Sequence, residues 1–110
     1  MLLLAFFTLG LSAAAVAADL EVGKTKVMFV CSDCHGLKGI SVVNNFANPA
    51  GQKELYLLSQ LKDFKAGTRK NIEVNLIAKQ LSEADMANIS AYFAGLAQPA
   101  KGAVKKTMQN

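Results

Sequence analysis

The five consecutive residues Cys31-Ser32-Asp33-Cys34-His35 constrain this chain more than any other feature. In 110 residues the chain has two cysteines and one histidine, and all three lie in this segment. Cys-x-x-Cys-His is the attachment signal for c-type haem. Residues three apart lie on one side of a helical turn, so both thiols can form thioether bonds to the two vinyl groups of one haem. His35 can then donate an imidazole nitrogen to the haem iron.

Other chemistries also use paired cysteines. A thioredoxin-like redox pair would follow a strand in a βαβ pattern, and the sequence shows no such pattern. A zinc site needs four ligands, and no second pair of Cys or His exists to complete it. A small structural disulfide between Cys31 and Cys34 stays open, because an exported protein permits one. Among these interpretations the sequence favours covalent haem.

Residues 1–18 carry no charge and end in small residues before Asp19. This pattern predicts a secretory signal peptide cleaved after Ala17 or Ala18, although no Lys or Arg precedes the apolar run. The alternative is an uncleaved membrane anchor, for which the run is slightly short of the roughly 20 residues of a span. We expect one domain over residues 19–98. A flexible basic tail is expected over residues 99–110, with Lys101, Lys105 and Lys106.

The apolar pattern predicts helices and no strand. In residues 22–34, one stripe at helical spacing carries both thiols, through Val27, Val30, Cys31 and Cys34. Gly36 and Gly39 end this helix and open a loop over residues 41–50. Phe46 lies in that polar loop, where it is expected to bury against either a haem edge or the ordinary core.

Residues 52–66 form the second predicted helix, with Gly67 just past its C-terminus. Its buried stripe consists of Leu57, Leu58, Leu61 and Phe64. The lysines of this helix are expected to face water: Lys53, Lys62 and Lys65. Residues 68–80 are less regular, and a short helix is expected towards Lys79.

The last predicted helix begins at the capping-box-like sequence Ser82-Glu83-Ala84-Asp85 and ends at Pro99. Its apolar face consists of Met86, Ile89, Phe93 and Leu96, and its small residues Ala87, Ala91 and Ala94 would let another helix approach closely. A domain of this size is often stabilised by a metal or a cross-link. The sequence thus predicts an all-α fold of about three or four helices wrapped around one covalent haem.

Further motifs accompany the Cys-x-x-Cys-His segment: Gly23, Gly36, Phe46-Ala47-Asn48-Pro49-Ala50-Gly51-Gln52, Tyr56-Leu57, Gln60-Leu61, Phe64, Gly67, Arg69, Leu81-Ser82-Glu83-Ala84-Asp85 and Ala91-Tyr92-Phe93. Together they resemble the class I c-type cytochromes of bacteria, which are small single-domain electron carriers. The resemblance covers most of the chain after residue 18. It implies an all-α cytochrome c-like fold in which the first and last helices cross and one haem edge is exposed.

The resemblance also implies one haem c, with Cys31 and Cys34 as its thioether residues and His35 as an axial iron ligand. It implies a one-electron carrier between redox partner proteins of the periplasm or membrane. Haem attachment outside the cytoplasm agrees with the predicted signal peptide, so we expect a periplasmic protein that is not embedded in the membrane. No enzyme is expected, because the lone histidine is committed to iron and no phosphate-binding glycine loop is present. Nucleic acid is not an expected partner, despite an isoelectric point of about 9.2.

Two positions depart from the family pattern. Ala47 replaces a proline in a region that supplies a backbone acceptor to the axial histidine. A backbone carbonyl survives substitution, so function is expected to persist with altered geometry. The distal methionine of the family falls at Val74, four residues before Ala78, and valine cannot ligate iron. Its loss is expected to lower the reduction potential and to open the iron to CO or NO.

The sixth iron ligand is therefore unassigned. Met28 is poorly placed for it, Met86 is expected in the core, and Met108 lies in the tail. The remaining candidates are water, an open position, or the residues that flank Val74, which are Lys70, Asn75 and Lys79. An open position would suit a haem module that binds or senses small ligands. A haem subunit of a larger redox complex is a further alternative.

Overall fold

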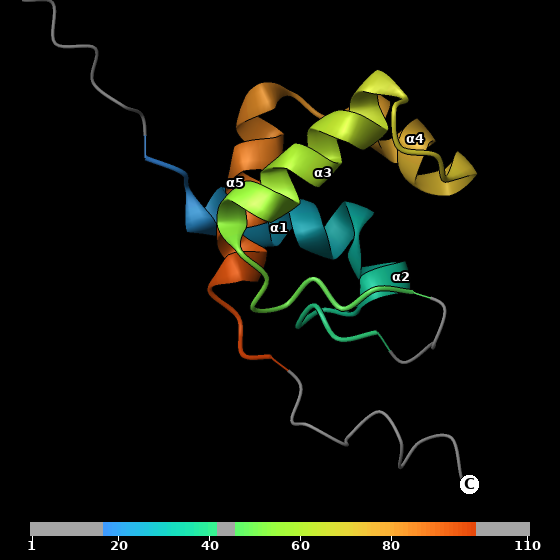
Figure 1. The fold of residues 1–110 in the computed structure, drawn as a ribbon. Helices are drawn as coiled ribbons and strands as arrows, with labels where there is room; N and C mark the ends of the chain where they lie inside the picture. The colour runs from blue at the N-terminus through green and yellow to red at the C-terminus, as the bar shows by residue number, and fades with distance from the viewer. Residues whose placement is uncertain (1–16, 42–45, 99–110) are drawn as a thin grey trace, which may run out of the picture.

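The computed structural model describes residues 17–41 and 46–98. Within these ranges the chain forms helices and no strand, in the order α1 (Leu20–Val30), α2 (Ser32–His35), α3 (Glu54–Ala66), α4 (Ile72–Lys79) and α5 (Glu83–Ala94). Figure 1 shows α1 and α5 crossing, with α3 lying over them and α4 beyond the far end of α3. The predicted all-α fold is confirmed. The signal peptide before residue 17 and the tail after residue 98 lie outside the described residues.

The first helix differs from the prediction at both ends. It begins at Leu20 because the carboxylate of Asp19 accepts hydrogen bonds from the backbone N–H groups of Glu21 and Val22, at 3.0 and 3.1 Å. It ends at Val30, and Cys31 separates it from the short helix α2. The prediction of one continuous helix over residues 22–34 is therefore wrong. The break gives residues 32–35 a direction of their own, which helical spacing alone does not reveal.

The crossing of α1 and α5 depends on Gly23. A Cβ atom at this position would lie 2.2 Å from the carbonyl oxygen of Asn88 and 3.2 Å from the Cβ atom of Tyr92. The side-chain oxygen of Asn88 also accepts a hydrogen bond from the backbone N–H of Asp19, at 2.8 Å. The predicted crossing of the first and last helices is confirmed, and a glycine on α1 makes the tight contact.

The core lies between α1, α3 and α5. Its buried members are Val27, Leu81, Met86, Ile89 and Phe93, and Leu57, Leu58 and Leu61 of α3 pack against them. The predicted capping box of α5 is present, with Ser82 and Asp85 each accepting the other's backbone N–H. The helix ends earlier than predicted, at Ala94, and the half-buried Leu96 follows it. Pro99, the predicted end, lies outside the described residues.

Helix α3 ends as predicted, with Gly67 in the left-handed conformation at a φ of 81°. The expectation that Lys65 faces water is wrong. Lys65 is half-buried, and its ammonium group donates a hydrogen bond to the carbonyl oxygen of Leu81. This bond joins α3 to the segment that leads into α5. The expected short helix before Lys79 is α4.

None of the helices in the described part of the chain is both long enough and apolar enough to cross a membrane.

Candidate haem-binding site

A cavity of about 340 Å³ is lined by residues of all five helices, among them Val30 of α1, Tyr56 of α3 and Ala78 of α4. The side chains of Cys31, Cys34 and His35 line it, as do Phe46 from the loop and Val74 from α4. Apolar residues of α3 and of the core form much of the remaining wall, among them Leu57, Leu61, Ile89 and Phe93. The three residues of the predicted haem motif thus meet in one apolar cavity.

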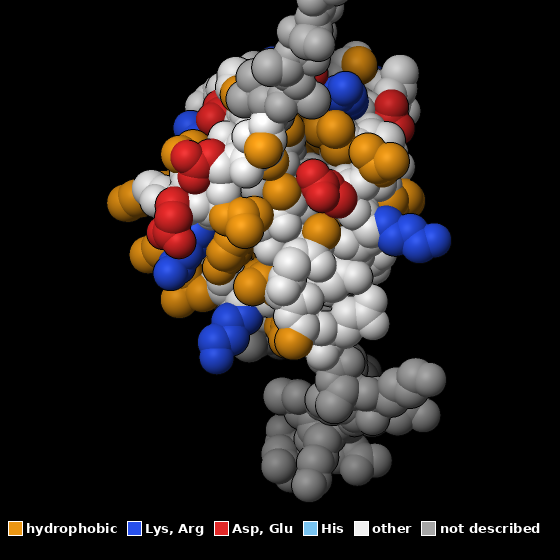
Figure 2. Space-filling view, turned by 90° about the vertical axis from the view of Figure 1, so that its left-hand side faces the viewer, with side chains coloured by type: hydrophobic (Ala, Val, Ile, Leu, Met, Phe, Trp, Pro, Cys, Tyr) orange, Lys and Arg blue, Asp and Glu red, His pale blue; other side chains and the backbone are white. Residues whose placement is uncertain are grey.

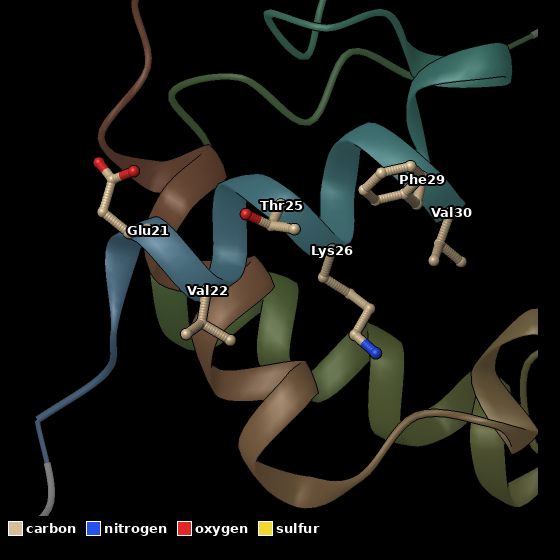
Figure 3. Close-up of a pocket in the computed structure, with 6 residues that line it drawn as sticks. All are labelled: Glu21, Val22, Thr25, Lys26, Phe29 and Val30. Carbon is tan, nitrogen blue, oxygen red and sulfur yellow. The ribbon is translucent and has the colours of Figure 1, made fainter.

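A second hollow, of about 410 Å³, lies on the outer face of α1. Figure 3 shows its lining residues projecting from one helix, with the ring of Phe29 among them. No thiol and no imidazole is among its described lining residues, and Val30 is the residue that it shares with the lining of the predicted haem site.

Cys31 and Cys34 are both half-buried free thiols. Burial and, secondly, the neighbouring Cys34 raise the pKa of Cys31 to about 11, so this thiol is protonated at neutral pH. Thioredoxin-like chemistry needs a cysteine whose pKa is lowered, because the thiolate is the nucleophile. Across the described residues no group of three or more His, Cys, Asp or Glu side chains could hold a metal ion.

The imidazole of His35 has a fixed partner. Its Nδ1 atom lies 2.8 Å from the backbone carbonyl oxygen of Ala47. Because a carbonyl can only accept, Nδ1 must carry the proton in this bond, which leaves the lone pair of Nε2 free for a metal. The backbone acceptor expected at this position is therefore present, although alanine replaces proline. A hydrogen bond of this kind fixes the ring orientation of a ligating histidine and raises its basicity.

The loop that supplies this carbonyl is anchored at its end. Gly39 has a φ of 67°, and its carbonyl accepts the N–H of Ala50 at 3.0 Å. The next residue, Gly51, donates its N–H to the carbonyl of Phe93 at 2.9 Å, which ties the loop to α5. A Cβ atom on Gly39 would lie 2.9 Å from the ring of Phe93, so the close approach and the positive φ both require glycine.

Phe46 was expected either at a haem edge or in the ordinary core. The structure places it in the cavity wall, where its ring centroid lies 6.3 Å from that of His35. It does not belong to the buried core cluster among the described residues. This placement agrees with the first alternative.

Val74 lines the cavity at the first turn of α4, and a network of two asparagines holds that turn in place. The side-chain oxygen of Asn71 accepts the backbone N–H of Val74 at 3.0 Å. The amide of Asn75 donates to the carbonyls of Phe64 and Arg69, at 2.7 and 2.8 Å, and its oxygen accepts the N–H of Asn71 at 2.8 Å. The position where the family resemblance expects a methionine is therefore a well-fixed part of the cavity wall.

The other side chains considered for the sixth ligand do not line the cavity, as far as the structure describes them. Met86 is fully buried in the core, as predicted, and Met28 is 48% exposed on α1. The amide of Asn75 is used by the two carbonyls described above. Lys70 and Lys79 are exposed and do not line the cavity. Met108 lies outside the described residues.

The polar part of the cavity wall includes residues that no sequence pattern assigned to the site. Arg69 lies over the ring of Phe64, 4.6 Å from its centroid, and donates a hydrogen bond to the side chain of Gln60. Asn71 lines the cavity while it caps α4. An asparagine directly before an apolar helical segment is a recognisable N-cap signal, which could have identified Asn71 and the start of α4.

The family model described as Cytochrome c matches residues 20–97. The chain is 44% identical to cytochrome c4 of Pseudomonas aeruginosa over 99 residues, which cover 84% of this chain and 49% of that protein. It is 35% identical to cytochrome c-554(548) of Halomonas halodenitrificans over 80 residues, which cover 70% of this chain and 95% of that protein.

Among solved structures, reduced cytochrome c4 from Pseudomonas stutzeri superposes with a TM-score of 0.69 at 42% identity, covering 74% of this chain and 47% of that one. The chain thus spans about half the length of the cytochrome c4 proteins that it matches. The match to the family model takes in every described helix, including the Cys-x-x-Cys-His segment and the crossing of α1 with α5. On these grounds the chain belongs to the cytochrome c family, whose members are electron-transfer proteins that hold haem c.

Proposed function

We propose that this chain is a periplasmic monohaem c-type cytochrome, a carrier that passes single electrons between redox proteins and is not itself an enzyme. The observation that best supports the proposal is the hydrogen bond from Nδ1 of His35 to the carbonyl of Ala47, which leaves Nε2 available to a metal, in a cavity that both thiols also line. Family membership supports the same reading of these residues.

The residues present fit haem c. Cys31 and Cys34 would hold the porphyrin covalently, and Nε2 of His35 would ligate the iron. Haem c bound here would supply a one-electron Fe(II)/Fe(III) couple. Apolar side chains of the cavity, such as Leu57, Leu61 and Ile77, would exclude water from the ring. Burial and ligand choice are the levers by which a protein sets the potential of that couple.

The finer features of the proposal rest on the sequence. One Cys-x-x-Cys-His segment supports a count of one haem. A domain over residues 19–98 agrees with the family match over residues 20–97. The uncharged residues 1–18 support export by a cleaved signal peptide, and residues 99–110 would form a flexible basic tail.

Redox proteins of the periplasm or membrane would be the partners. On the face shown in Figure 2, Lys and Arg side chains are interspersed with acidic and hydrophobic ones and form no continuous basic patch. Docking on that face would therefore not depend on broad electrostatic attraction to an acidic partner.

Spectroelectrochemical titration of the exported, matured protein tests this function. The expected result is a reversible change in the haem absorption bands that follows a one-electron Nernst curve. Cys31→Ser combined with Cys34→Ser should abolish the covalent haem, while Ser32→Ala, the control within the same motif, should keep it. A matured protein that absorbs as haem but cannot be cycled reversibly would contradict the carrier role.

A further inference from the structure

We propose that the sixth coordination position of this haem site takes a small neutral π-acceptor ligand, CO or NO, on ferrous iron. The inference rests on the proposed function, because it assumes that haem c occupies the cavity of Cys31, Cys34 and His35. It goes further in assigning a ligand-binding site beside Val74.

The described wall of the cavity offers no further donor atom suited to ferrous iron. Soft or nitrogen donors that hold ferrous haem iron in proteins come from His, Met, Cys or Lys side chains. Apart from His35 and the two cysteines of the attachment motif, no such side chain lines the cavity in the described part of the chain. The oxygen donors Tyr56 and Glu73 do line it. Oxygen donors favour ferric iron, so they would leave the sixth coordination position of ferrous iron unoccupied.

The cavity wall around Val74 is also rigid. The hydrogen bonds of Asn71 and Asn75 fix the first turn of α4 to the end of α3, so Val74 cannot easily be replaced by a neighbouring residue of the helix. Valine is β-branched, short and without a donor atom, and it has little rotamer freedom. The fixed turn therefore keeps a side chain without a donor atom at the position where a ligating side chain would lie.

The charged side chains that line the cavity determine whether it favours a neutral or an anionic ligand. The carboxylate of Glu73 borders the cavity beside Val74, and it would repel an anionic ligand. The one guanidinium of the wall, on Arg69, is engaged by Gln60 and by the ring of Phe64. Much of the remaining surface near Val74 is apolar and includes Leu61, Phe64 and Ile77. These surroundings favour a neutral diatomic molecule over an anion such as cyanide or azide.

Titration of the dithionite-reduced holoprotein with CO tests the proposal. The wild-type protein should bind one CO per haem, with a shift of the Soret band. Val74→Met should restore a thioether at this position, give a low-spin ferrous spectrum and weaken CO binding at least tenfold. Leu76→Met is the matched control, because Leu76 lies on the same helix, is 59% exposed and does not line the cavity. This control should bind CO as the wild type does.

The contrary outcomes are distinct. A wild-type ferrous haem that is low-spin and does not react with CO overturns the inference while leaving the carrier function intact. If Met108→Ala then restores CO binding, the tail supplies the sixth ligand and the inference is wrong for that reason. Equal CO affinity in wild type and Val74→Met would show that the site does not lie beside Val74. A matured protein without haem would overturn the proposed function itself.

Discussion

The Nδ1 atom of His35 lies 2.8 Å from the carbonyl oxygen of Ala47, so the orientation of the imidazole depends on the position of a loop. The described part of that loop is held by hydrogen bonds of Asn48, Ala50 and Gly51. The side-chain oxygen of Asn48 accepts the backbone N–H of Ser41 at 2.6 Å, across the base of the loop. The hydrogen bonds of this loop are thus part of the haem site although they touch no haem-binding atom.

Asn48→Ala removes the bond across the base of the loop and should lower the free energy of unfolding by about 1 kcal/mol, which is typical for a lost intramolecular hydrogen bond. Urea denaturation of the holoprotein measures this. Ser59→Ala serves as the control, because the hydrogen bonds of the Ser59 hydroxyl stay within α3: it donates to the carbonyl of Tyr56 at 3.0 Å and accepts from the side-chain amide of Gln60 at 3.5 Å. The control should stay within about 0.5 kcal/mol of the wild type. Equal stability of both variants would show that Asn48 does not secure the loop.

Gly23→Ala should destabilise the protein by about 2–3 kcal/mol, because its Cβ atom would overlap the carbonyl of Asn88 and force α1 away from α5. Thermal unfolding measures the loss. Gly95→Ala is the control: its new Cβ atom would meet nothing closer than 3.6 Å, and its φ of −80° suits alanine. This control should raise stability by about 0.5 kcal/mol. A tolerated Gly23→Ala would mean that the two helices do not cross as tightly as described.

Much of the helical framework could be predicted from local signals. The Ser82 capping box, the glycine after α3 and the apolar stripes of α3 and α5 are all properties of short segments, and the structure bears them out. The close approach at Gly23 was not predicted: the family motif includes this glycine, but a glycine within a helix does not by itself reveal what lies opposite.

Other features depend on contacts between distant segments, which periodicity does not report. The break of the first helix at Cys31 has no signal in the apolar spacing. The burial of Lys65 accompanies its hydrogen bond to the carbonyl of Leu81. The bond between His35 and Ala47 joins residues twelve apart through a loop without regular structure. Only the resemblance to known cytochromes indicated it in advance.

Ser90→Ala should stabilise the protein by about 1 kcal/mol, because the Ser90 hydroxyl oxygen is fully buried and has no hydrogen-bond partner among the described residues. Ser82→Ala, which removes the N-cap of the same helix, should have the opposite sign and cost about 1 kcal/mol. Urea denaturation of both variants in parallel should show free energies of unfolding that differ from the wild type in opposite directions. A destabilised Ser90→Ala would show that the hydroxyl has a partner in solution.

Asp85 should make stability depend on acid pH. The backbone N–H of Ser82 is the main cause that lowers the pKa of this carboxyl below its ordinary value of 3.8, with smaller contributions from the Ser82 hydroxyl and from Lys26 at 3.5 Å. The ionised group therefore stabilises the fold at pH values above 3.8. That contribution is lost as the pH falls through the lowered pKa of the folded state.

Asp85→Ala should accordingly cost about 1 kcal/mol at neutral pH, and the difference from wild type should shrink as the wild-type carboxyl becomes protonated. Denaturation curves measured across the acid range check this. Glu83→Gln is the control, because Glu83 is exposed and its pairing with Lys62 at 3.7 Å lies at the surface. A difference between wild type and Asp85→Ala that does not change with pH would contradict the role given to the carboxylate.

Covalent haem attachment is tested most directly by the intact mass of the exported, matured protein, measured under denaturing conditions together with its absorption spectrum. Thioether bonds survive unfolding, so we expect a polypeptide heavier by one haem, with a Soret band that stays with the protein. Cys31→Ser combined with Cys34→Ser should have the mass of the bare polypeptide. A matured wild-type protein of bare polypeptide mass, without Soret absorbance, would contradict the assignment of Cys31, Cys34 and His35 to haem.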